Sequence, residues 1–323
     1  MTSITVEAVE LTKRYGAYTA VEGVSFSASQ GEIMGLLGPN GAGKTTTIRL
    51  LTTVLEPSSG GYSIAGHPSK SATEIRRCIG VLPESSGYPI HQTGGEYLRF
   101  YARLYGKSRS QARSLSADLL AAVGLEKRGR SQISTYSRGM RQRLGIARAL
   151  VNDPVVVFLD EPTLGLDPAG QAQVLDIIRT VANARDATVV LSTHLLPEVE
   201  QVCSKVVILN HGRVVGAGSV GEVISTALIE HSADLRVPLH LVTRARQALS
   251  NLPGLTIEQV EGQPDLLRIA VETPGAVSGA SPTEAINAGL AAVAAAGIPV
   301  LRFELEGARL SDAFLKMTGE AVA

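Results

Sequence analysis

Short apolar runs alternate with segments of helical spacing along residues 4–221. Residues 4–11 alternate apolar and polar side chains, which predicts a half-buried strand. Other runs are almost wholly apolar, as in strands buried on both faces, and occupy 32–37, 155–159, 187–192 and 205–210. Segments with helical spacing lie at 44–55, 94–105, 109–123 and 138–150. Strands that alternate with helices predict a mainly parallel sheet and an α/β fold.

Two changes in this pattern predict the domain organisation. A helical block at about 85–150 interrupts the first domain, 1–222, and a linker, 223–234, precedes a C-terminal accessory domain, 235–323. The expected strands of the accessory domain are 236–243, 255–260, 266–271 and 300–305. Its expected helices are 244–251, 283–296 and 310–317. This order predicts a small α+β domain of the ferredoxin-like type. The stretch 273–282, rich in Gly, Ser and Pro, is expected to be a mobile loop.

Composition narrows the choice of function. The 30 basic and 30 acidic residues of the 323-residue chain balance, so nucleic-acid binding is not expected. Cys78 and Cys203 form no metal or disulfide pattern and fit a reducing compartment. The sequence shows no run of about 20 apolar residues and no signal peptide. If the protein acts at a membrane, we expect another chain to hold it there.

A glycine-rich loop joins the run 32–37 to the helix expected at 44–55. Its sequence, Gly-Pro-Asn-Gly-Ala-Gly-Lys-Thr, fits the P-loop pattern G-x-x-x-x-G-K-[ST]. In such a loop backbone N–H groups face phosphates, the lysine reaches the outer phosphates and the hydroxyl contacts Mg²⁺. Lys44 is therefore also a predicted catalytic residue, and Thr45 a predicted Mg²⁺ ligand. The predicted nucleotide-binding residues of this loop are Gly38, Pro39, Asn40, Gly41, Ala42, Gly43, Lys44, Thr45 and Thr46.

Two carboxylates end the apolar run 155–159. Ligands gather at the carboxyl ends of parallel strands, so Asp160 and Glu161 are well placed for a site. Asp160 is predicted to hold Mg²⁺, directly or through water. Glu161 is predicted to accept a proton from the attacking water. Without the P-loop, such a pair would more often be a helix cap or a solvated turn.

A third motif, Tyr136-Ser-Arg-Gly-Met140, opens the helical segment 138–150. With it, residues 4–221 resemble the ATPase subunit of an ATP-binding cassette (ABC) transporter, whose signature motif usually reads Leu-Ser-Gly-Gly-Gln. The resemblance implies a P-loop NTPase fold in which Ser137 and Gly139 bind the γ-phosphate of ATP held by a partner subunit. A hydroxyl and N–H groups at a helix start suit an anion.

The resemblance implies three further site residues. Tyr15 would stack on the adenine; the alternative is a core tyrosine, and Tyr18 is a nearby competitor. Asp167 would lie at the interface between two ATPase subunits; the equally weighted alternative is a helix cap before a proline. His194, which ends the Leu-Ser-Thr-His motif two residues after the apolar run 187–192, would contact the γ-phosphate.

Three positions depart from the usual family pattern. Glu84 stands where the family usually has a glutamine that senses Mg²⁺ and the membrane partner, and it is predicted to bind nucleotide through Mg²⁺ or water. Arg138 replaces a glycine and Met140 a polar amide. All three resemble the daunorubicin-resistance and sodium-export subgroup, as does the C-terminal stretch 310–319.

Aromatic residues concentrate after Glu84. Five of the 13 Tyr and Phe residues fall between Tyr88 and Tyr105. In the family this region receives a helix of the membrane subunit, and interfaces are enriched in aromatics. The i, i+4 spacing of Tyr97, Tyr101 and Tyr105 equally fits a helix core. The sequence favours the two interpretations about equally; in the interface hypothesis Tyr88 and part of 97–105 contact the membrane subunit.

The resemblance thus implies an enzyme that hydrolyses ATP with Mg²⁺ to power export. Its expected partners are an integral membrane permease subunit and a second ATPase subunit, and its expected place is the cytoplasmic face of the membrane. One alternative is a soluble cassette ATPase that acts on ribosomes or DNA, which the zero net charge disfavours. Another is the ATPase subunit of an importer. The transported substrate cannot be inferred from this chain.

Overall fold

The structure is a computed structural model that describes residues 3–85, 87–227, 232–260, 262–271, 282–305 and 309–319. The chain forms two compact units. The first contains the residues up to Val220 together with those from Met317 onward, and the second runs from Gly221 to Lys316. Apart from Pro282, the loop expected at 273–282 lies outside the described residues.

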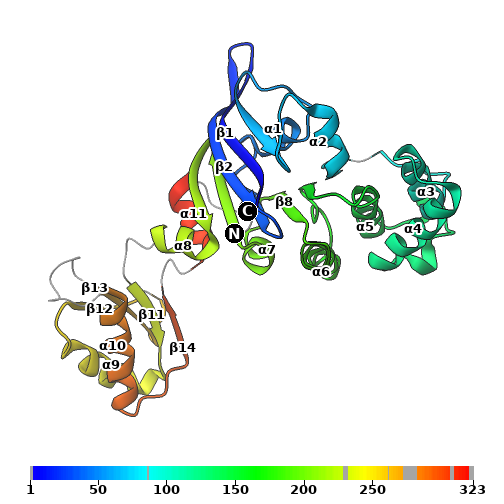
Figure 1. Ribbon diagram of the computed structural model, residues 1–323. Helices are drawn as coiled ribbons and strands as arrows, with labels where there is room; N and C mark the ends of the chain where they lie inside the picture. The colour runs from blue at the N-terminus through cyan, green and yellow to red at the C-terminus, as the bar shows by residue number, and fades with distance from the viewer. Residues whose placement is uncertain are drawn as a thin grey trace. The chain divides into compact units, whose positions relative to one another are not determined.

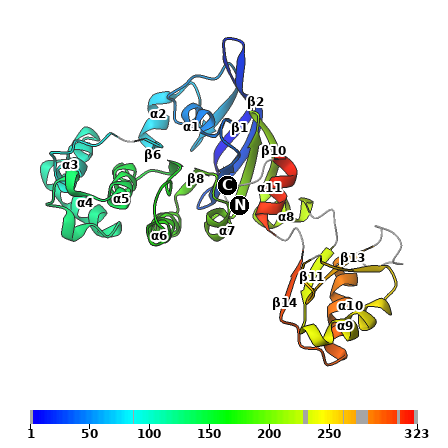
Figure 2. The same ribbon diagram turned by 180° about the vertical axis from the view of Figure 1, so that it is seen from behind.

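Two sheets build the first unit (Figures 1 and 2). The larger is parallel except for its edge strand β10, and its order is β10 (Arg213–Ser219), β9 (Lys205–Asn210), β3 (Ile33–Leu37), β8 (Thr188–Thr193), β7 (Val156–Asp160) and β6 (Ile79–Leu82). The smaller is antiparallel, in the order β2 (Tyr18–Ser29), β1 (Ile4–Tyr15), β4 (Ser59–Ile64) and β5 (His67–Pro68). The mainly parallel α/β sheet predicted from the sequence is therefore present.

One hydrophobic core joins these sheets. Val24 and Phe26 of the smaller sheet share a buried cluster with Phe158 of the larger one and with Ile48 and Leu51. The last two residues belong to the helix that follows β3. Each large apolar side chain buried in this way contributes about 1.5–3 kcal/mol. The helices of this part of the unit are α1 (Lys44–Leu51), α2 (Ala72–Cys78), α6 (Pro168–Arg185) and α7 (Leu196–Val202).

The strand register places three functional segments at one edge of the larger sheet. Leu37, the last residue of β3, pairs with Thr193, the last residue of β8. Asp160, the last residue of β7, pairs with Ser192. Because these strands are parallel neighbours, the glycine-rich loop, the Asp160-Glu161 pair and His194 all leave the sheet at the same edge.

The inserted block is helical. It contains α3 (Gly94–Leu104), α4 (Arg109–Ala122), α5 (Arg138–Ala149) and the 3₁₀ turns Glu126–Arg128 and Ile133–Thr135. Capping boxes fix the starts of α3 and α4, through Thr93 with Glu96 and Ser108 with Gln111. Arg148 of α5 donates to the backbone oxygen of Val81 in β6 at 2.7 Å, which ties the block to the larger sheet. Among the helices of the described residues, none is both long and apolar enough to cross a membrane.

The second unit has the predicted ferredoxin-like order of elements. Its antiparallel sheet runs β12 (Leu255–Gln259), β13 (Leu266–Val271), β11 (Ser232–Arg236) and β14 (Arg302–Leu305). Leu235, Leu267 and Ile269 of this sheet form a core with Leu249 and Val293. The helices that supply the last two side chains are α9 (Val242–Ser250), which follows a 3₁₀ turn at Leu239–Leu241, and α10 (Pro282–Ala295).

The strand expected at 236–243 is misplaced. The structure has β11 at Ser232–Arg236, and residues 242–250 are helical. Pro238 lacks a backbone N–H and cannot donate to a sheet ladder, so the strand ends before it. The apolar residues after Pro238 instead begin α9, where Val242 is buried in the core. The described part of the expected linker, 223–234, contains the end of α8 (Val220–Ala227) and the start of β11. The last helix is α11 (Leu310–Thr318).

Candidate nucleotide-binding site

The glycine-rich loop occupies the space between β3 and α1, and two glycines make its path possible. A Cβ on Gly38 would lie 2.4 Å from the backbone oxygen of Leu209. A Cβ on Gly43, whose φ is +103°, would lie 2.6 Å from the backbone oxygen of Ala20. Neither position tolerates a side chain. The loop therefore packs tightly on its neighbours and leads directly into the N-terminus of α1, which favours anions.

Lys44 points back across this loop. Its Nζ donates to the backbone oxygens of Gly38 at 2.6 Å and Pro39 at 3.2 Å, and it lies 3.9 Å from Oε1 of Glu161. Burial lowers the pKa of the Lys44 ammonium, while the carboxylates of Glu161 and Asp160 act in the opposite direction. The predicted catalytic lysine thus lies in a buried position beside the predicted base.

Asp160 is 3% exposed, and its carboxylate accepts hydrogen bonds from two hydroxyl groups. Oγ1 of Thr45 donates to Oδ1 of Asp160 at 3.3 Å, and Oγ of Ser192 donates to the same oxygen at 2.5 Å. A carboxylate and a hydroxyl at this distance are hard oxygen ligands of the kind that Mg²⁺ prefers. The residues predicted to hold Mg²⁺ on α1 and β7 are therefore neighbours.

Glu161 and His194 are paired. Nδ1 of His194 lies 3.0 Å from Oε2 of Glu161, and the backbone N–H of Glu161 donates to Oγ of Ser192 at 3.0 Å. Glu161 has a φ of +49°, a left-handed conformation that is costly for a residue with a Cβ. Such strain clusters at functional sites. Sequence reasoning missed Ser192, although it lies in the Leu-Ser-Thr-His motif.

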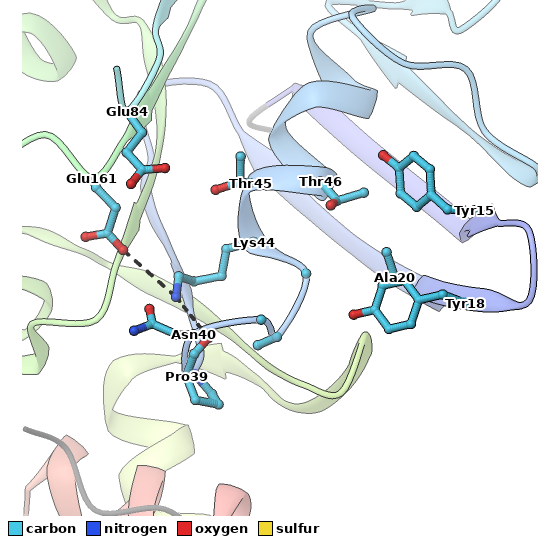
Figure 3. A pocket seen from close by; sticks show the side chains of 13 residues that line it. Tyr15, Tyr18, Ala20, Pro39, Asn40, Lys44, Thr45, Thr46, Glu84 and Glu161 are labelled. Carbon is cyan, nitrogen blue, oxygen red and sulfur yellow. Dashed lines mark hydrogen bonds and ion pairs between the residues drawn. The ribbon is translucent and has the colours of Figure 1, made fainter. Parts of the chain in front are cut away.

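A cavity of about 330 Å³ lies over the glycine-rich loop (Figure 3). Its walls include Tyr15 and Tyr18 on one side and Glu84 and Glu161 on the other, with Lys44 between them. Tyr15 is 46% and Tyr18 60% exposed, so neither is the core tyrosine that was the alternative to an adenine contact. Predicted residues that also line this cavity are Pro39, Asn40, Gly41, Ala42, Gly43, Thr45 and Thr46.

The Ser137 motif contributes to a different part of the surface, outside the lining of this cavity. Ser137 is the N-cap of α5, and its Oγ accepts from the backbone N–H of Met140 at 3.2 Å. Asp167 is the N-cap of α6, with Oδ1 accepting from the N–H of Gly170 at 3.1 Å. The helix-cap interpretation of Asp167 is therefore realised, and a role for Asp167 at a subunit interface stays a prediction.

Arg138 packs against the loop that precedes α6. A Cβ on Gly165, whose φ is +70°, would lie 2.5 Å from Cζ of Arg138, so the guanidinium covers the Gly165 backbone. A Cβ on Gly139 would lie 3.8 Å from Cδ2 of Leu166. The start of α5 and the Asp167 loop of one chain are therefore in direct contact, and the arginine that departs from the family pattern is part of that contact.

These features define a P-loop nucleotide hydrolase. The glycine-rich loop leads into the N-terminus of α1, an arrangement that suits phosphates, and Glu161, just after β7, lies across the cavity from the rings of Tyr15 and Tyr18.

Comparison with known proteins narrows this class. The model of the ABC transporter family matches residues 21–164. A daunorubicin/doxorubicin resistance ATP-binding protein of Streptomyces peucetius is 36% identical over 97% of this chain and 92% of its own length. A Nod factor export ATP-binding protein of Burkholderia orbicola is 36% identical over 95% of this chain and 94% of its own length. A solved ATP-binding subunit of an ABC transporter matches with a TM-score of 0.62 and 34% identity, over 69% of this chain and 92% of that one.

The chain therefore belongs to the ATP-binding subunits of the ABC transporter family. The fold class, the ATPase activity and the similarity to the daunorubicin-resistance subgroup, all predicted from the sequence, are confirmed. The predicted class of function, the ATP-binding subunit of an ABC exporter, is confirmed as well.

Proposed function

We propose that this chain hydrolyses ATP to drive the efflux of a substrate through a separate permease subunit, while bound to the cytoplasmic face of the membrane. The observation that carries the proposal is the position of Glu161, which lines the cavity 3.9 Å from Nζ of Lys44 and lies 3.0 Å from Nδ1 of His194. The direction of transport is supported by relatives named for drug resistance and for Nod factor export, which match nearly the whole chain.

In this proposal the glycine-rich loop and Lys44 bind the outer phosphates of ATP. The ammonium of Lys44 exchanges its bonds to the Gly38 and Pro39 oxygens for bonds to phosphate, which are stronger because both partners are then charged. Thr45 and Asp160 are the ligands for Mg²⁺, with Glu84 acting directly or through water. Bound there, the metal neutralises phosphate charge. Tyr15 stacks on the adenine, because an exposed ring at the cavity wall offers such a face.

Glu161 is the proposed general base. Its carboxylate is 8% exposed and points toward the cavity, so it can take a proton from a water held near the γ-phosphate. The Nδ1 contact at 3.0 Å orients the His194 ring and leaves Nε2 to contact the γ-phosphate. The two residues would then act as a pair.

A second ATPase subunit completes the proposed site. Ser137 and Gly139 stand at the N-terminus of α5, a 12-residue helix, where backbone N–H groups favour a phosphate. They lie outside the cavity of their own chain, which supports their action on ATP held by the partner. Asp167, next to the contact of Arg138 with Gly165, would lie at the same interface.

The proposed permease contact is the exposed face of α3. Phe100 is 54%, Leu104 65% and Tyr105 44% exposed. Tyr97, by contrast, is 2% exposed and packs against Tyr101 at a ring distance of 5.0 Å. The two interpretations of this aromatic stretch thus apply to different residues: Tyr97 is core, and the three exposed side chains are candidates for an interface.

The test is a pull-down of tagged Glu161→Gln from detergent-solubilised membranes, with and without ATP. We expect ATP to retain a second ATPase subunit and a multi-spanning membrane protein, with ATP turnover lowered about 10²–10⁴-fold through loss of the base. The matched control is Glu74→Gln, an exposed carboxylate in the first turn of α2. Wild-type turnover by Glu161→Gln would refute the assignment of the base. Recovery of ribosomes or DNA-bound proteins without a membrane protein would favour the soluble ATPase instead.

A further inference from the structure

A buried carboxylate lies behind the proposed catalytic pair. Glu198, in the first turn of α7, is 6% exposed. Its Oε2 accepts hydrogen bonds from Oγ1 of Thr163 at 2.6 Å and from Oγ1 of Thr193 at 3.5 Å. Its Oε1 is buried and has no hydrogen-bond partner among the described residues. None of the roles assigned so far uses this side chain.

The two threonines belong to the two catalytic segments. Thr163 follows Glu161 by two residues, and Thr193 immediately precedes His194; both threonines are fully buried. Oγ1 of Thr193 also accepts from the backbone N–H of Leu195 at 3.0 Å, which fixes the turn after β8. One carboxylate therefore bridges the segment that carries the proposed base and the segment that carries the histidine.

A second set of hydrogen bonds also joins the two catalytic segments. Ser192 joins β8 to the end of β7 through its bonds to Asp160 and to the N–H of Glu161. The contact of Glu161 with His194 at 3.0 Å joins the same two segments. Movement of either segment by about 1 Å would break this contact, and misplacement of that size can lower turnover about 10²-fold.

We propose that Glu198 is a positioning residue, which holds the segments of Thr163 and Thr193 so that Glu161 and His194 stay within hydrogen-bond distance. This inference rests on the roles proposed above for Glu161 and His194. Burial of a carboxyl group is unfavourable compared with burial of an apolar side chain of similar size. The other buried positions of α7 are apolar: Leu196, Val199 and Val202. An acid among them indicates a requirement for its hydrogen bonds.

A simpler explanation is that Glu198 stabilises the N-terminus of α7 as an acid in the first turn. Such an acid needs only its charge near the helix end. The hydrogen bonds of Glu198 go instead to threonines on two other segments, and one of its oxygens has no partner among the described residues. The two explanations differ in what Glu198→Gln does, because glutamine keeps an acceptor oxygen and removes the charge.

Three titratable neighbours interact with this carboxyl group: Glu161, His194 and Cys203. Burial raises the pKa of Glu198 and the Glu161 carboxylate acts in the same direction, while the hydrogen bonds from Thr163 and Thr193 and the charge of His194 oppose the rise. Burial and, to a smaller degree, the Glu198 charge raise the pKa of the Cys203 thiol at the other end of α7. A carboxamide keeps an acceptor oxygen in nearly the same place as the carboxyl group, so it can accept the same hydrogen bonds from the two threonines without the charge. Glutamine is therefore a close substitute at this position.

The test is steady-state ATPase kinetics on the full chain. We expect Glu198→Ala and Thr163→Val each to lower kcat about 10–100-fold with KM for ATP within about twofold, because the bound nucleotide is untouched. Glu198→Gln should stay within about threefold of wild type. The double variant should lose no more than the worse single variant, since both remove one bridge. Glu200→Ala, an exposed acid on the same helix, is the matched control.

Two results would overturn the inference. One is wild-type kcat in Glu198→Ala. The other is a loss in Glu198→Gln as large as in Glu198→Ala, which would indicate a role of the charge. Glu161→Gln measured in parallel separates the two proposals: if it hydrolyses ATP at the wild-type rate, the proposed base is wrong. If it is inactive while Glu198→Ala is active, only the positioning role fails.

Discussion

Oγ of Ser192 lies 2.5 Å from Oδ1 of Asp160, and the same hydroxyl accepts the backbone N–H of Glu161 at 3.0 Å. One fully buried serine on β8 therefore fixes both carboxylates at the end of β7. The parallel pairing of Asp160 with Ser192 makes this possible, because it sets the two side chains at the same level of the sheet.

Ser192→Ala should weaken the hold on Mg²⁺. The change removes a hydrogen bond to a buried carboxylate, worth about 1.5–3 kcal/mol, and among the described residues leaves Thr45 as the one donor to Oδ1 of Asp160. We expect a lower free energy of unfolding and a higher Mg²⁺ concentration for half-maximal ATPase activity. Urea unfolding and a Mg²⁺ titration measure the two effects.

The matched control is Ser204→Ala, whose hydroxyl donates to the backbone oxygen of Ile33 at 3.3 Å, away from the carboxylates. It should lose about 0.5–1.5 kcal/mol of stability and keep the Mg²⁺ requirement of the wild type. An equal shift of the Mg²⁺ requirement in both variants would count against the role given to Ser192.

Lys44→Met should weaken ATP binding without lowering the stability of the nucleotide-free protein. Burial lowers the pKa of Lys44, which reflects the unfavourable desolvation of its charge. Removal of the ammonium should therefore leave the nucleotide-free protein as stable as wild type or more so, while ATP affinity falls about 10–100-fold through lost charge-assisted bonds. Equilibrium binding of a fluorescent ATP analogue and thermal unfolding without nucleotide check this.

Lys205→Met is the control for that variant. Nζ of Lys205 donates to the backbone oxygen of Ser27 at 2.7 Å, and Lys205 is outside the cavity lining. Its ATP affinity should stay within about twofold of wild type. The prediction is wrong if Lys44→Met binds ATP as well as this control does.

The glycine-rich loop and the Asp160-Glu161 pair could be predicted because their chemistry resides in consecutive residues, placed by a strand that the hydrophobic pattern reveals. Ser192 and Glu198 could not, since their partners are 32 and 35 residues away and depend on strand register and on the orientation of α7. The position of β11 could not be predicted either. Its charged residues Asp234 and Arg236 alternate with buried ones, and the more apolar stretch that follows fits the pattern of a strand better.

Phe100→Ala should impair assembly with the permease without unfolding the subunit. The ring is 54% exposed, so its loss should change stability by less than about 1 kcal/mol. If it is a central interface residue, its truncation should weaken the complex by about 2 kcal/mol, or roughly 30-fold. Val54→Ala, 68% exposed at the turn after α1, controls for loss of exposed apolar surface. If the permease co-purifies equally with both variants, α3 is not part of the interface.

The raised pKa of Glu198 gives the protein a defined pH dependence. When the folded-state pKa of an acid exceeds its ordinary value, here 4.5, the unfolded chain releases the proton first as pH rises. The contribution of Glu198 to stability is therefore greatest below pH 4.5 and falls as pH rises from there through the folded-state pKa. Its limiting slope is about 1.4 kcal/mol per pH unit for one proton.

Glu198→Gln does not titrate and should lose this dependence. The difference in unfolding free energy, wild type minus Glu198→Gln, should decrease as pH rises above 4.5 and level off once the folded carboxyl has ionised. Urea unfolding at a series of pH values measures it. Glu200→Gln, exposed on the same helix, should give a nearly constant difference. A difference for Glu198→Gln that grew with pH would mean that the native state stabilises the ionised carboxylate. The hydrogen bonds that join Thr163 and Thr193 through Glu198 would then depend on its negative charge.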